Sequence, residues 1–319
     1  MIGNIGQFWR LMRELDVNAI RADFERPTSL SVLGSDRPSA ERVARMIARE
    51  AIGSEVLVDT LGEWEALGRD WRKIPDAYVI VIAGPLDPAG RRALADLSIG
   101  DIPLQVVQIG QGVDVVVVGV PEERVLVADP GASDEEVGNQ VLNALVRLTP
   151  DAMLPLGRRY PRIREAVAER LILDVARANA QFAALSSLPA NIPLVGGVVG
   201  DFADILVLTK NQLILLFKLA GLYGRDLEVG RQLVSEILPV VGGAFLWRST
   251  ARSLVGLLPT YMAVVPKVVV AYSGTFVVGE MARYYYRYGR RPPPGLVREL
   301  SAEGLRLARS TLGRLRGQI

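Results

Sequence analysis

Three residues, Gly34, Ser39 and Asp59, stand at positions suited to a phosphate and magnesium site. Gly34 ends a short strand-like run, LSVLG, and a helical run follows from about residue 38. Strand, glycine turn and helix are the parts of a P-loop, GxxxxGK[ST], whose N–H groups surround phosphate while its Lys binds the terminal phosphates and its hydroxyl binds Mg²⁺. Asp59 opens DTLG, which fits the DxxG pattern on the Mg²⁺ side of such sites. The spacing suggests nucleotide binding.

The side chains that bind phosphate and Mg²⁺ in a P-loop are nevertheless missing. In alignment from Gly34, the second Gly, the Lys and the metal-binding hydroxyl are replaced by Ser39, Ala40 and Glu41. Pro38 removes one N–H from the loop, and Asp36 brings negative charge to the place of the phosphates. The guanine-selecting motif NKxD is replaced by QIGQ at 108–111. We predict a degenerate nucleotide site at Gly34, Ser39 and Asp59, without competent hydrolysis and without a bound cofactor.

An active but atypical P-loop NTPase is the alternative. It would bind GTP or ATP through backbone amides at the helix N-terminus near Ser39, and Mg²⁺ through Asp59, with a basic group supplied from elsewhere. A third interpretation is a soluble binding module whose pocket holds a different ligand.

The composition narrows the chemistry further. The 319 residues include neither Cys nor His. Disulfides, thiolate zinc sites, imidazole metal sites and Ser-His-Asp or Cys-His catalysis are therefore excluded. Any reaction would need carboxylates, Arg, Lys, hydroxyl groups or a cofactor, so we expect no catalytic residues and no metal site.

The first half reads as an α/β domain. Strand-like runs, several of them continuously apolar, fall at 30–34, 55–60, 77–84, 103–110, 113–120 and 124–129. Helical runs fall at 38–51, 87–97 and 133–148. Such alternation predicts a mostly parallel, P-loop-type sheet covered by helices on both faces. Ligands in these folds bind at the carboxyl ends of the strands, where the three candidate residues stand.

The second half reads as helical and apolar. We expect helices at about 195–222, 228–239, 244–257, 260–288 and 296–315. The predicted domains are an amphipathic N-terminal helix packing on the next domain (1–26), the α/β domain (27–150), a connector and linking helix (151–187), and an apolar helical domain with a basic C-terminal helix (188–319). The fold class is thus α/β plus all-α.

The segments 188–226 and 237–289 resemble the YcjF-like family of bacterial domains of unknown function. The matching positions are Pro189, Pro193, Asp204, Thr209, Gln212, Leu219, Ala220, Tyr223, Gly224, Gly242, Gly243, Arg252, Pro259, Thr275, Gly279 and Tyr284. The resemblance implies a helical, often membrane-associated module behind an Era- or Der-like GTPase domain or its relic, and it supplies no catalytic residues.

Charge and aromatic residues point to a membrane surface. From Arg283 to Ile319 there are nine Arg and two Glu, an excess of +7, whereas the first 282 residues carry a net charge of −5. The apolar run at 253–279 is broken by Pro259 and Pro266, so we do not predict a membrane-spanning helix there. Tyr and Arg beside such a run are typical of an anchor on an anionic leaflet. The membrane-facing candidates are Trp247, Tyr284, Tyr285, Tyr286, Arg287, Arg290 and Arg291.

The sequence therefore predicts a non-catalytic pseudo-GTPase with a scaffold or interaction role at the cytoplasmic face of the inner membrane, where it is peripheral or partly inserted. A purely cytoplasmic location is the alternative. The expected partners are an anionic membrane surface and an unknown protein, with self-association left open, and nucleic acid is not expected.

Overall fold

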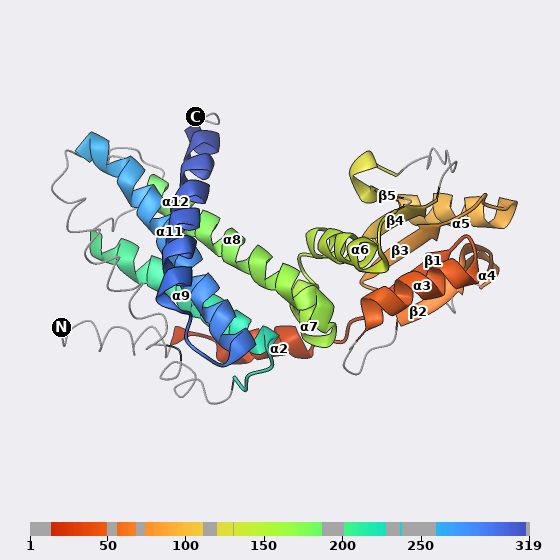
Figure 1. Cartoon of the computed structure of the whole chain (residues 1–319), viewed down its shortest axis with the longest axis horizontal. Helices are drawn as coiled ribbons and strands as arrows, with labels where there is room; N and C mark the ends of the chain where they lie inside the picture. The colour runs from red at the N-terminus through yellow and green to blue at the C-terminus, as the bar shows by residue number, and fades with distance from the viewer. Residues whose placement is uncertain are drawn as a thin grey trace. The chain divides into compact units, whose positions relative to one another are not determined.

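The structure of the protein is a computed structural model that describes residues 14–49, 56–67, 74–110, 120–129, 131–186, 201–227, 237 and 260–316. It divides into two compact units (Figure 1). The α/β unit comprises Asp23–Val167, and the helical unit comprises Met1–Ala22 and Ala168–Ile319. The two points of division fall inside helices, α2 (Val17–Glu25) and α8 (Pro161–Leu185), whereas the sequence suggested domain ends at 26, 150 and 187.

The α/β unit is built on a five-stranded parallel sheet in the order β2-β1-β3-β4-β5. The strands are β1 (Leu30–Gly34), β2 (Val56–Thr60), β3 (Ala77–Ile82), β4 (Leu104–Ile109) and β5 (Val125–Ala128). The helices are α2 (Val17–Glu25), which crosses into this unit, α3 (Arg37–Ala48), α4 (Leu61–Ala66), α5 (Pro88–Ile99), α6 (Asp134–Leu148) and α7 (Met153–Arg159), with a 3₁₀ turn at Glu122–Arg124. The predicted mostly parallel sheet is confirmed.

Helices cover both faces of this sheet. Helices α3 and α6 pack on one face and contact each other, while α4 and α5 pack together on the other. Every residue of β1 and β3 is buried, as their continuous apolar character requires. The face under α4 and α5 holds a core built around Leu33, Trp64, Ile80 and Leu94. The sheet therefore presents only its edges and strand ends to ligands.

Side-chain caps fix where three of these helices begin. Asp36 caps α3, Asp87 caps α5, and Ser133 forms a capping box with Glu136 at the start of α6. Each cap satisfies a backbone N–H that the first helical turn leaves without a partner. The predicted helices at 38–51, 87–97 and 133–148 are present, and no end differs by more than three residues. Two short helices, α4 and α7, were not predicted.

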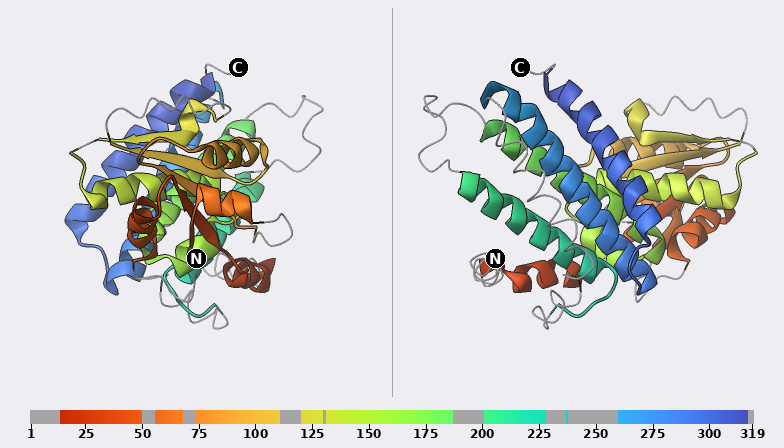
Figure 2. Two further views of the ribbon diagram at one scale, coloured as in Figure 1. Left: turned by 90° about the vertical axis from the view of Figure 1, so that its right-hand side faces the viewer. Right: turned by 60° about the vertical axis from the view of Figure 1, so that its left-hand side comes forward.

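The helical unit is formed by α8, α9 (Asp201–Leu222), α11 (Thr260–Tyr288) and α12 (Pro294–Arg316). Helix α11 packs on α9 and forms an antiparallel hairpin with α12 (Figure 2). Glycines permit close approach: a Cβ on Gly279 would lie 2.7 Å from Ile172 Cγ1, and one on Gly304 would lie 3.1 Å from Phe276 Cδ1. The predicted helix at 260–288 is confirmed at both ends.

A polar layer interrupts the apolar core of this unit. Thr275 Oγ1 accepts hydrogen bonds from Asn179 Nδ2 and Gln212 Nε2, each at 2.9 Å, and donates to Ala271 O at 2.8 Å. Asn211 Nδ2 donates to Asn179 Oδ1 at 2.7 Å. The layer joins α8, α9 and α11. Three of the positions in the YcjF-like resemblance, Gln212, Thr275 and Gly279, thus lie in the helix contacts.

Several predicted elements lie outside the described residues. These are most of the strand at 113–120, the helices at 228–239 and 244–257, and the first thirteen residues of the N-terminal helix. Across the ranges that the structure describes, no helix combines the length and the apolarity needed to cross a bilayer.

Candidate functional site

The β1–α3 loop lies where the strand order reverses. Strand β1 sits between β2 and β3, so its carboxyl end opens at the point where doubly wound sheets bind ligands. Ser35 fastens this loop to β3: its N–H donates to Val81 O at 2.8 Å, and its Oγ accepts from the N–H of Ala83 at 3.0 Å. The predicted loop is therefore in the expected place for a nucleotide site.

The carboxylate of Asp36 occupies the N-terminus of α3. The N–H of Ser39 donates to Asp36 Oδ1 at 2.9 Å, and Ser35 Oγ lies 3.2 Å from Asp36 Oδ2. Partial burial opposes ionisation, but the hydrogen bonds from Ser39 and Ser35 outweigh it and hold the pKa of Asp36 below its usual value. A phosphate in a P-loop binds to these same helix N–H groups, so an internal anion stands where the ligand would.

Gly34 is required by packing in this loop. A Cβ at this position would lie 2.3 Å from Asp36 O and 2.8 Å from Ala40 Cβ. The loop turns back so tightly on the first turn of α3 that no larger residue fits. This close approach accounts for the glycine without any phosphate.

Asp59 is brought beside this loop, as its spacing predicts. Parallel pairing sets Asp59 level with Leu33, one residue before Gly34. Its carboxylate lies 3.7 Å from Arg37 Nη2, and the same nitrogen donates to Glu63 Oε2 at 2.8 Å. Partial burial, together with the charge of Glu63, raises the pKa of Asp59 although Arg37 opposes the shift. The guanidinium of Arg37, which lies beside the predicted magnesium ligand, is thus engaged by two carboxylates.

The DTLG sequence belongs to a helix cap. Thr60 and Glu63 form a capping box, in which the N–H of Glu63 donates to Thr60 Oγ1 at 3.1 Å and the N–H of Thr60 donates to Glu63 Oε2 at 2.8 Å. Gly62 lies inside α4 as a result. The hydrogen bonds from Thr60 and Arg37 lower the pKa of Glu63. Among the residues described, no group of three or more acidic side chains is arranged to hold a metal ion.

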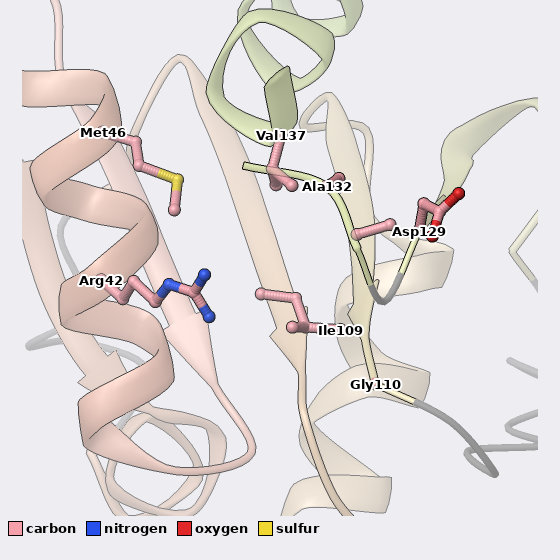
Figure 3. Close-up of a pocket in the computed structure, with 8 residues that line it drawn as sticks. Arg42, Met46, Ile109, Gly110, Asp129, Ala132 and Val137 are labelled. Atoms are coloured by element: carbon pink, nitrogen blue, oxygen red, sulfur yellow. The ribbon is translucent and has the colours of Figure 1, made fainter. Parts of the chain in front are cut away.

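A small cavity lies at the carboxyl ends of β4 and β5 (Figure 3). Its volume is about 130 Å³, and it is lined by Arg42, Met46, Ile109, Gly110, Ala128, Asp129, Ala132 and Val137. The Arg42 guanidinium points toward this space and pairs with Asp134, to which its Nε donates at 2.9 Å. Ligand sites of drug size occupy about 300–1,000 Å³, so the cavity is too small for a nucleotide. Sequence reasoning did not find it, because its walls come from four separate elements.

The membrane-facing candidates differ in their exposure. Tyr284 and Tyr285 are half-buried, Tyr286 is buried with its ring stacked near that of Tyr223, and Trp247 lies outside the described residues. The Arg candidates, Arg287, Arg290 and Arg291, are exposed at the turn between α11 and α12. The basic candidates are thus exposed, whereas the candidates in the tyrosine run are partly or fully buried.

Comparison with protein-family models, with curated proteins and with solved structures finds no match to this chain. The resemblance to YcjF-like domains therefore gains no support from these comparisons.

Proposed function

We propose that the protein is a non-catalytic interaction protein, in which a GTPase-like α/β scaffold persists without its nucleotide site. One observation supports this most directly: the Asp36 carboxylate already caps the helix N-terminus that would bind phosphate. A triphosphate would have to displace this carboxylate and would meet the further negative charges of Asp59 and Glu63. Arg37, a positive charge that the structure places beside Asp59, pairs with both of those groups.

The scaffold interpretation also fits the sheet. The parallel order β2-β1-β3-β4-β5 is compatible with a GTPase-like domain, with β1 leading into the β1–α3 loop and β2 ending in the first two residues of DTLG. We propose that the α/β unit is a relic of such a domain, and that the helical unit gives the protein an interaction role at the cytoplasmic face of a membrane. The partners are an anionic membrane surface and a protein of unknown identity.

Nucleotide titration tests the proposal. Isothermal calorimetry on the full chain with GTP or ATP and Mg²⁺ should show no saturable heat up to about 1 mM nucleotide, which is a binding free energy weaker than about −4 kcal/mol. Micromolar binding that needs Mg²⁺ and disappears in Asp59→Ala would refute the proposal and favour the atypical NTPase instead. Asp87→Ala is the control, because it also removes one Asp carboxylate from this unit, at the cap of α5 and outside β2 and the β1–α3 loop.

A further inference from the structure

We propose that the turn between α11 and α12 is a docking surface for an anionic membrane. We call it the basic tip, and it consists of Arg287, Tyr288, Arg290, Arg291 and Arg298, all of which are exposed. The inference rests on the membrane role proposed above and gives it a surface and a mode of binding. Figure 2 shows the two helices of the hairpin side by side, joined at this turn.

The end of α11 holds its aromatic and basic side chains in a fixed arrangement. The rings of Tyr284 and Tyr288, one helical turn apart, have centroids separated by 4.6 Å, and the guanidinium of Arg287 lies 5.1 Å from the centre of the Tyr288 ring. Gly289 then ends the helix with a φ of +66°, and its N–H donates to Tyr285 O at 2.8 Å. The left-handed residue turns the chain sharply and directs it to Arg290 and Arg291.

The charge of this surface is strongly one-sided. From Met281 to Arg298 the sequence contains five Arg and no acidic residue, and exposed Glu299 follows directly after Arg298. Arg283 pairs with buried Glu280, with Nη2 and Oε2 2.6 Å apart, whereas the other four Arg side chains are exposed. The contact of Tyr286 with Tyr223 places the end of α9 at the same end of the unit, where it adds the opposite charges of Arg225 and Asp226. The tip therefore keeps a local excess of positive charge.

An anionic membrane suits this arrangement better than nucleic acid does. Aromatic rings gathered with Arg at the end of an apolar helix are typical of the membrane–water interface, where the ring lies at headgroup level. Tyr288 is 51 % exposed and can enter that layer while the neighbouring guanidinium groups contact lipid phosphates. Each basic residue near an anionic leaflet strengthens binding roughly fivefold, so three of them account for about a hundredfold.

Vesicle flotation with the full chain tests the tip. In about 0.1 M salt the protein should float with phosphatidylcholine vesicles containing about 30 % phosphatidylserine and should not float with phosphatidylcholine alone. The triple variant Arg290→Gln, Arg291→Gln, Arg298→Gln should bind about a hundredfold more weakly. The control triple variant Arg45→Gln, Arg91→Gln, Arg306→Gln removes three exposed charges elsewhere and should bind like the unaltered protein.

Three results would overturn the inference: equal loss of binding in both triple variants, equal binding to neutral vesicles, or displacement of the protein from vesicles by single-stranded RNA at matched phosphate concentration. The first would show that only net charge matters, the second that apolar insertion drives binding, and the third that the tip prefers nucleic acid. The calorimetric test of the proposed function is independent of this one, because nucleotide binding at the β1–α3 loop would not change the flotation result.

Discussion

Replacing Thr275 by Val should weaken the helical unit, although the two side chains have nearly the same shape. Thr275 is 1 % exposed, and its hydroxyl oxygen accepts hydrogen bonds from the side-chain amides of buried Asn179 and Gln212. Valine offers no acceptor, so both amide N–H groups lose this partner away from water. Each such loss costs about 1–3 kcal/mol, and the added methyl group returns roughly 0.8 kcal/mol. We expect a net loss of about 1–5 kcal/mol, centred near 3 kcal/mol.

The assay compares Thr275→Val with Thr275→Ser in urea unfolding followed by circular dichroism. The serine variant keeps the oxygen and loses one methyl group, which should cost about 1 kcal/mol. Ser273→Ala is the control in the same helix, because its hydroxyl donates only to Val269 O, and it should change stability by less than about 0.5 kcal/mol. Hydrogen exchange in α8, α9 and α11 would assign the change to the helical unit.

The order of the two variants decides the matter. If burial of apolar surface dominated at this position, Val would be at least as stable as Ser, because it carries the extra methyl group. Hydrogen-bond reasoning gives the opposite order. A valine variant that matches or exceeds the serine variant in stability would refute the account of the polar layer.

Two further predictions concern the same unit. Gly279→Ala should lower the free energy of unfolding by about 1–3 kcal/mol, because its Cβ would meet Ile172 Cγ1 at 2.7 Å. Ile172→Ala should reduce that cost in a double-mutant cycle. The control Gly313→Ala, at a position with open space around it, should be neutral or slightly stabilising. Glu280→Gln should stabilise the protein at pH 8 and flatten its urea midpoint between pH 4 and 8. Burial, with the charges of Glu169 and Glu303, raises the pKa of Glu280 above 4.5 against the opposing effect of Arg283, so its favourable contribution is complete below that pH and is lost as pH rises through the folded-state value. A midpoint equally pH-dependent in both proteins would contradict this sign.

Local patterns predicted most of the elements. The helix at 133–148 followed from Ser133 and the acidic first turn, and both features form the observed cap. The apolar runs of β1 and β3 correctly indicated strands buried on both sides. The short helix α4 was missed although its signal was present: Thr60-Leu61-Gly62-Glu63 fits the T-x-x-E capping box. The DxxG interpretation drew attention to Asp59 and Gly62 instead.

The contacts that define the sites were beyond local patterns. Arg37 meets Glu63 across 26 positions, and Thr275 meets Asn179 across 96. Such pairs depend on strand order and helix packing, which periodicity does not specify. The spacing alone did place Gly34 and Asp59 together, because parallel neighbours end at the same edge of a sheet. It could not show that Asp36 turns inward to cap α3.

The proline run after Arg291 has a consequence for how the basic tip would bind. Pro292, Pro293 and Pro294 fix three successive φ angles near −65°, and Arg291 is itself restricted because it precedes a proline. Ordering the backbone of a flexible loop costs about 1–2 kcal/mol per residue when it binds. In this turn the proline rings restrict the backbone covalently, so much of that freedom is absent before any partner binds. A partner would therefore immobilise side chains only, and the affinity of the tip would not be reduced by a loop that must first become ordered.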